Sequence, residues 1–118
     1  MEEWYRRQLK KAVPTLIAKW EPIMGVGVER IYVQRMKTRW GSCNHEARSI
    51  RLNSDLAKKP SEFLEYIVVH EMVHLLEPSH NERFYKLMDR FLPNWRNYRS
   101  QLNRLPITHE DWADVIFP

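Results

Sequence analysis

Two histidines and a glutamate near the middle of the chain have the spacing of a metal site. His70 and His74 are four residues apart, and on an α-helix such residues lie one turn above each other on the same face, where both imidazoles can reach one ion. Glu71 would be rotated by about 100° from His70, so its carboxylate would lie beside the ion and could take a proton from a metal-activated water. The pattern predicts two metal ligands and a general base.

A third histidine, His80, can complete this site. Pro78 precedes it, has no N–H with which to continue a helix, and favours an extended conformation for Glu77, so the chain must turn there. Such a turn can bring His80 back to the ion and leave a fourth tetrahedral position for water, as in a catalytic zinc site. The alternative is a pair of hydrogen-bonded core histidines on a buried helix, but that interpretation gives Glu71 and His80 no role.

Length and composition are those of one globular domain. The 118 residues can bury about two-thirds of their unfolded surface around a single core, so we expect one domain over residues 1–118. No apolar run reaches the roughly 18 residues of a membrane span, and the N-terminus lacks the apolar core of a signal peptide, which together predict a cytoplasmic protein without a membrane partner. The single cysteine, Cys43, cannot form an internal disulfide, in agreement with a reducing compartment.

Positive charge is concentrated in the first half of the chain. Residues 1–59 contain 13 Lys and Arg against 6 Asp and Glu, whereas residues 60–118 contain 6 against 9. Such an imbalance can serve an anionic partner such as nucleic acid or a phosphorylated substrate. The charges are spread in ones and twos, however, which favours an ordinary solvated face. His45 and His109 are likewise expected to be surface histidines.

The elements before the histidine motif predict a helix followed by strands. Residues 2–24 have the apolar spacing of an amphipathic helix, which Pro14 is expected to divide or kink. Residues 28–36 are rich in β-branched and aromatic side chains and are predicted to form a strand. The stretches 37–43 and 49–53 flank a short polar loop, which indicates an antiparallel hairpin.

Helices are predicted to carry all three histidines. Residues 63–76 are apolar on nearly every face apart from the motif, so this helix is expected to be buried, with Ser61 as its N-cap. Ser79 and Glu82 have the spacing of a capping box, so a second helix is expected to begin at His80 and to hold it rigidly.

The C-terminal part of the chain is also predicted to be helical. One helix is expected over 95–104, ended by Pro106, and a short amphipathic tail helix over 106–118 is expected to dock on the core, near the mouth of the cleft as a further hypothesis. The order of elements predicts an α+β fold in which a small antiparallel sheet packs on the metal-binding helix.

With these elements in place, the chain resembles the YgjP-like zinc metallopeptidases, relatives of the SprT group in the zincin superfamily. The resemblance covers residues 4–104 and rests on Met36 to Cys43, Ile50 to Asn53, Tyr66 to His74, and His80 with Phe84. It implies a zincin-like fold, a zinc cofactor and a peptide or protein substrate. It also implies that the zinc ligands are His70, His74 and His80 and that the catalytic base is Glu71.

Several neighbours of the motif are further candidates. Arg39 and Trp40 lie on or beside a strand along which a zincin-like fold would run an extended substrate, so they are candidate substrate-binding residues; a structural ion pair is the alternative for Arg39. Cys43 could fill the open metal position, although an inert thiol is the favoured interpretation. Tyr66, one helical turn before His70, could orient that histidine or polarise a substrate, but a core tyrosine is favoured.

The sequence therefore predicts a zinc-dependent metallopeptidase that hydrolyses peptide bonds by metal-activated water with a Glu general base. Two alternatives stay open. Arg39 and the basic first half would also suit a metal-dependent hydrolase of the phosphoanhydride bonds of nucleotides. A nucleic-acid-associated module with a vestigial site is the alternative from another class.

Overall fold

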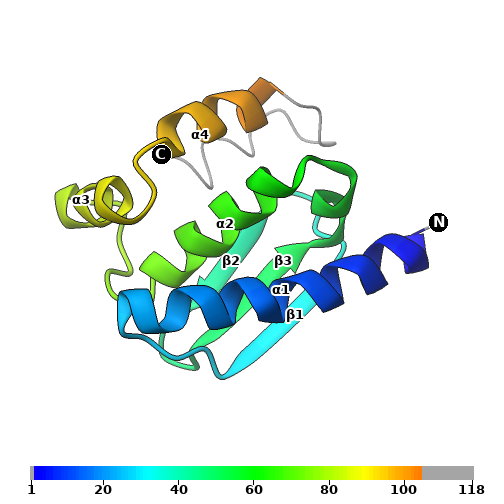
Figure 1. Cartoon of the computed structure of the whole chain (residues 1–118), viewed down its shortest axis with the longest axis horizontal. Coiled ribbons are helices and arrows are strands. Elements are labelled where there is room, and N and C mark those ends of the chain that lie inside the picture. The colour runs from blue at the N-terminus through cyan, green and yellow to red at the C-terminus, as the bar shows by residue number, and fades with distance from the viewer. Residues whose placement is uncertain (1, 105–118) are drawn as a thin grey trace.

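Helices cover one face of a small sheet, and one of these helices is itself enclosed by its neighbours. The computed structural model describes residues 2–104 (Figure 1). In chain order the elements are α1 (Glu2–Met24), β1 (Arg30–Gln34), β2 (Gly41–Asn44), β3 (Ser49–Asn53), the 3₁₀-helix η1 (Ser54–Lys58), α2 (Ser61–Val73), α3 (Glu82–Phe91) and α4 (Trp95–Arg104). None of the helices in this part of the chain has the length and apolar character needed to cross a membrane.

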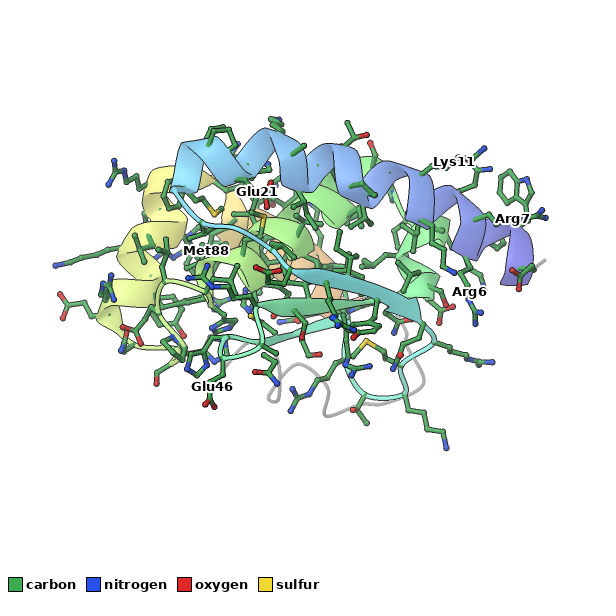
Figure 2. The ribbon with its side chains drawn as sticks, turned by 90° about the horizontal axis from the view of Figure 1, so that it is seen from below. Arg6, Arg7, Lys11, Glu21, Glu46 and Met88 are labelled. Carbon is green, nitrogen blue, oxygen red and sulfur yellow. The ribbon has the colours of Figure 1, made fainter. Side chains whose placement is uncertain are left out.

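Helix α1 packs on the core through one apolar stripe. Its buried side chains recur every three or four residues, as the amphipathic pattern predicted: Leu9, Val13, Ile17, Trp20 and Met24. Figure 2 shows Arg7 and Lys11 on the outer side of the helix, where both are exposed. The helix continues through Pro14, so the predicted division was wrong. Because Pro14 is exposed, the carbonyl of Lys10 that it leaves without an N–H partner can bind water instead.

The sheet has the strand order β1-β3-β2. The hairpin of β2 and β3 is antiparallel, as predicted, and pairs Cys43 with Ile50. Strand β1 pairs with β3 in parallel, with Ile31 opposite Ile50, so the sheet is mixed and the prediction of a wholly antiparallel sheet was wrong. The reason is that β3 inserts between β1 and β2. The chain still reverses between β1 and β2, but these two strands lie at opposite edges and do not pair.

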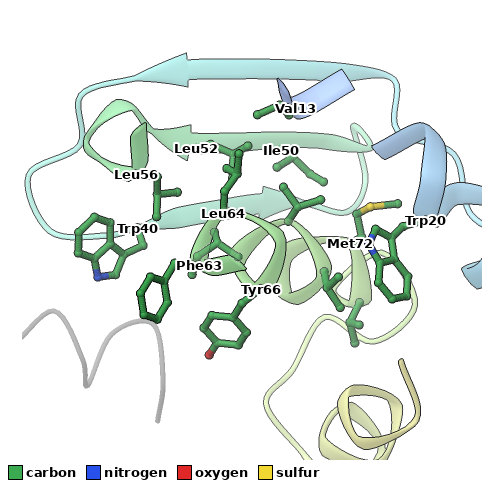
Figure 3. Packing of buried hydrophobic residues seen from close by; sticks show 14 of the residues in the cluster. Val13, Trp20, Trp40, Ile50, Leu52, Leu56, Phe63, Leu64, Tyr66 and Met72 are labelled. Atoms are coloured by element: carbon green, nitrogen blue, oxygen red, sulfur yellow. The ribbon is translucent and has the colours of Figure 1, made fainter. Parts of the chain in front are cut away.

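Both α1 and α2 pack on the same face of the sheet, with α1 against β1 and α2 against β2 and β3. The apolar side chains of β1 and β3 alternate toward these helices, and Ile50 and Leu52 are fully buried (Figure 3). On the opposite face Arg51 is exposed. Helices α3 and α4 cover the other side of α2. The central helix is therefore enclosed, which explains why it is apolar on nearly every face.

Helix α2 begins one residue earlier than a Ser61 cap requires. Its N-cap is Pro60, no side chain caps it by a hydrogen bond, and Ser61 is already its first helical residue, so the predicted cap was wrong. The ψ of 147° at Pro60 is non-helical, so the helix begins at the residue after it. The helix ends at Val73 rather than at 76, and a turn over 74–76 follows.

Helix α3 is capped by Asn81, whose side-chain oxygen accepts a hydrogen bond from the Phe84 N–H at 3.0 Å. The predicted capping box at Ser79 was wrong because the Ser79 N–H is engaged with the Glu77 carboxylate at 3.1 Å. His80 therefore precedes the helix. The helix over 95–104 is confirmed as α4. The predicted tail helix over 106–118 and His109 lie outside the described residues.

Candidate active site

Three histidines from two neighbouring segments meet at one point. His70 lies in the last turn of α2, His74 is the C-cap of that helix, and His80 lies in the bend before α3. Their Nε2 atoms are 3.1 Å apart for His74 and His80 and 3.4 Å apart for His80 and His70. Within residues 2–104, these three side chains form a group that could hold a metal ion, with one ligating atom of each inside 4.8 Å of the others.

The spacing of these nitrogens fits a tetrahedral metal. Metal–nitrogen bonds of about 2.0 to 2.1 Å at tetrahedral angles place ligand atoms about 3.3 to 3.4 Å apart. The measured separations of 3.1 and 3.4 Å are within a few tenths of an ångström of that value. The three imidazoles are therefore already arranged so that their lone pairs can meet at one ion.

The surroundings keep the imidazoles uncharged. Burial, reinforced by the neighbouring histidines, lowers the pKa of His70 well below its ordinary value. Burial likewise lowers the pKa of His74 to about 4, and it lowers the pKa of His80. A neutral imidazole is the form that binds a metal, so the site is ready for an ion at neutral pH.

Hydrogen bonds fix the loop that returns the chain from His74 to His80. His74 Nδ1 lies 3.1 Å from the carbonyl oxygen of Glu77, and since a carbonyl can only accept, Nδ1 carries the proton and Nε2 faces the cluster. Arg83 donates to the carbonyl of Leu76 at 3.0 Å and contacts the Glu77 carboxylate at 3.4 Å. No motif in the sequence predicted this role for Arg83.

Glu71 lies beside the cluster at the base of the pocket. Its side chain is only 2% exposed. Burial raises the pKa of this carboxyl to about 8, and the positive charge of Arg39 acts in the opposite direction. A Cβ added at Gly41 would lie 3.1 Å from Glu71 Oε2 and 2.9 Å from Ile67 Cγ2. Strand β2 thus approaches the glutamate as closely as a residue without a side chain allows.

A pocket of about 260 Å³ opens over the cluster, between the hairpin and the histidine loop. It is lined by Arg39, Gly41, Ser42, Cys43, His45, His70, Glu71, His74, Pro78 and His80. Gly41 and Ser42 line the pocket although no motif in the sequence marked them as site residues. His45 is exposed, as expected, but it also lines the pocket, because the hairpin turn that carries it lies beside the histidine loop.

The two candidate substrate residues have different positions. Arg39 is exposed at the pocket, and its backbone carbonyl accepts a hydrogen bond of 2.8 Å from the buried side chain of Asn53. Trp40 is 0% exposed and does not line the pocket; Figure 3 shows it in the apolar cluster with Phe63. The prediction that Trp40 contacts substrate was therefore wrong, because this residue points into the core.

Cys43 and Tyr66 have the structural roles favoured from the sequence. Cys43 lines the pocket but is not part of the histidine group, and burial, with the Glu71 charge, raises its thiol pKa to about 12. Tyr66 is fully buried, its ring centroid lies 6.0 Å from that of His70, and burial raises its pKa well above the ordinary value. It packs behind His70 and does not line the pocket.

Two solved structures share this fold. The metallopeptidase zymogen abylysin of Pyrococcus abyssi is 18% identical, with a TM-score of 0.69 over 76% of this chain and 90% of that chain. The metallopeptidase zymogen jannalysin of Methanocaldococcus jannaschii is also 18% identical, with a TM-score of 0.65 over 76% and 92% of the two chains. Such similarity shows that this chain shares the α+β fold of these two structures. No curated protein matches the sequence.

The fold is thus shared with metallopeptidases, and the family match over residues 1–105 makes this chain a metallohydrolase of the metallopeptidase class. The sequence places it more narrowly, because residues 1–105 match the YgjP-like metallopeptidase domain. The chain belongs to the YgjP-like metallopeptidase family.

Proposed function

We propose that this protein is a zinc-dependent metallopeptidase in which His70, His74 and His80 hold the zinc. One observation carries the proposal: Nε2 separations of 3.1 and 3.4 Å match what tetrahedral zinc requires of its nitrogen ligands. Three histidine ligands leave one coordination position open, which is typical of catalytic rather than structural zinc.

Glu71 acts as the general base of the proposed reaction. When bound, zinc would supply Lewis acidity, which polarises a peptide carbonyl and makes a water molecule easier to deprotonate. The Glu71 carboxylate lines the same pocket as the three imidazoles, so it can reach that water. It takes the proton from the attacking water and then delivers it to the leaving nitrogen, which converts the amide nitrogen into a good leaving group.

The proposed substrate is a peptide or protein segment in an extended conformation. Strand β2 lies at one edge of the sheet and lines the pocket through Gly41, Ser42 and Cys43. An exposed strand edge can pair with an extended peptide through main-chain hydrogen bonds. Arg39 is exposed and lines the same pocket, so we propose that its guanidinium binds a substrate carbonyl or carboxylate.

One experiment tests the proposal directly. Metal content is measured on purified protein, and the zinc-loaded protein is then incubated with a peptide library and with nucleoside triphosphates. We expect about one zinc per chain and cleavage of peptides that stops when a chelator removes the metal. Hydrolysis of nucleotides without peptide cleavage would select the phosphoanhydride alternative. Salt-sensitive binding to DNA or RNA that survives metal removal, without hydrolysis, would select the nucleic-acid alternative.

A further inference from the structure

One phenylalanine ring contacts all three histidines. The centroid of the Phe84 ring lies 4.6 Å from that of His74, and the two rings are nearly parallel, at 26°. It lies 5.0 Å from the centroid of His70 and 4.9 Å from that of His80, at steep interplanar angles of 70° and 84°. Phe84 is 1% exposed. The three imidazoles thus pack around a single buried ring.

The backbone that carries Phe84 is tied to the third histidine. Phe84 lies in the first turn of α3, and its N–H donates to the side-chain oxygen of Asn81 at 3.0 Å. Asn81 follows His80 directly in the chain. The cap therefore joins a candidate ligand and the ring beneath it in one short rigid unit, so that neither can shift without the other.

We propose that Phe84 is a positioning residue for the metal centre, holding the three imidazoles in the orientation that an ion requires. This inference rests on the proposed metal site. A ring packed against an imidazole restricts its rotation, so less side-chain freedom is lost when an ion binds. The face of an aromatic ring also attracts positive charge, which an imidazole gains on coordinating a cation. An aliphatic side chain of similar size supplies neither the flat surface nor this attraction.

The test compares two buried positions on the same helix. Phe84→Leu removes the ring, whereas Met88→Leu changes a side chain that is equally buried one helical turn further along α3 (Figure 2). Zinc affinity is measured by competition with a chelator, and the melting temperature of the metal-free protein is measured alongside. Phe84→Leu is expected to weaken zinc binding by about 10- to 100-fold, the usual effect of losing a residue that orients metal ligands. Met88→Leu should keep an affinity within about threefold of the parent's.

Further readings separate positioning from general packing. The visible absorption of the cobalt-loaded protein, which reports ligand geometry, should change in Phe84→Leu and stay unchanged in Met88→Leu. Should Phe84→Leu fail to fold, Phe84→Met fills more of the space without a ring and is expected to show the same loss of affinity. Parent-like zinc affinity in the variant at Phe84 would overturn the inference, as would an equal loss in Met88→Leu. A parent that binds no zinc would instead overturn the proposed metal site itself.

Discussion

Helix α2 and the segment 74–84 both supply histidines to the cluster, but different forces hold them. In α2 the side chains around the motif are buried between the sheet and the outer helices, so packing positions His70. The segment 74–84 has few buried residues before Phe84, and its course is fixed by the hydrogen bonds of Glu77 and Arg83. Apart from His70 itself, changes in α2 and its sheet should therefore act mainly on stability or catalysis, and changes in the segment mainly on metal affinity.

The largest effect is expected at Glu71, where catalysis can be separated from both packing and metal binding. Glu71→Gln preserves the volume of the side chain but cannot take a proton from water. General-base assistance contributes about 10² to 10⁴ in rate, so hydrolysis should fall at the upper end of that range. Bound zinc and melting temperature should stay close to the parent's. A variant that hydrolyses within threefold of the parent would contradict the role of Glu71, and one that loses zinc would make the carboxylate a ligand or a ligand anchor.

The next effect concerns His80, the proposed ligand that lies outside α2 and its cap, in the loop before α3. His80→Ala should lower zinc affinity by more than about 100-fold, the upper end for residues that only orient ligands. The metal-free protein should still fold, because α2 is held by apolar packing. Zinc titration and a thermal melt of the metal-free variant check both expectations. Full zinc occupancy would remove His80 from the site and make Glu77 the next candidate.

A substitution in the sheet tests the packed side of the site. Gly41→Ala places a methyl group 2.9 Å from Ile67 and 3.1 Å from Glu71, closer than side chains normally approach. It should reduce the free energy of unfolding by about 1 to 3 kcal/mol and displace the glutamate, with loss of hydrolysis. Gly27→Ala is the matched control, since nothing lies within 4 Å of the added carbon and its φ is not positive. Equal stability of the two variants in denaturant titrations would show that the sheet can adjust at Gly41.

The smallest effect is expected at Arg83, which supports the histidine loop from outside. Arg83→Met keeps the length of the side chain but removes its hydrogen bonds to Leu76 and Glu77. Zinc affinity should fall by about tenfold, at the low end for outer partners of a metal site, with little change in melting temperature. Lys86→Met on the same helix removes an exposed ion pair with Glu82 and should leave zinc affinity unchanged. Similar affinities for these two variants would mean that the loop holds its course without Arg83.

The parts of the fold that depend on periodicity were predictable from the sequence. The motif helix, the hairpin and α4 follow from repeating apolar positions and short polar loops, and the three histidines follow from spacing and a proline. The helix caps were not predicted correctly. Pro60 caps α2 without any side-chain hydrogen bond, and Asn81 caps α3 through its side chain, whereas Ser61 and Ser79, which have suitable spacing, do not serve as caps.

Two other errors have one cause, which is long-range pairing. The parallel partner of β1 is β3, which lies fifteen or more residues further along the chain, so no pattern within either segment could have predicted the pairing. Whether Trp40 faces the pocket or the core depends on where β2 begins. The backbone just before Trp40 is held by Asn53, the last residue of β3, whose buried side-chain amide donates to the carbonyls of Met36 and Arg39. Phe84 appeared in the family resemblance, but its contacts with three imidazoles needed the folded structure.

The burial of Glu71 has a consequence for the evolution and engineering of this protein. A buried ionisable carboxyl opposes folding, and Gly41 beside it has no side chain that could stabilise the charge. Selection for heat resistance alone would therefore replace Glu71 with an apolar residue early, giving a more stable protein without the proposed general base. In a laboratory library screened only for thermal stability, variants that have lost this glutamate should be enriched, and they should be more stable but less active than the parent.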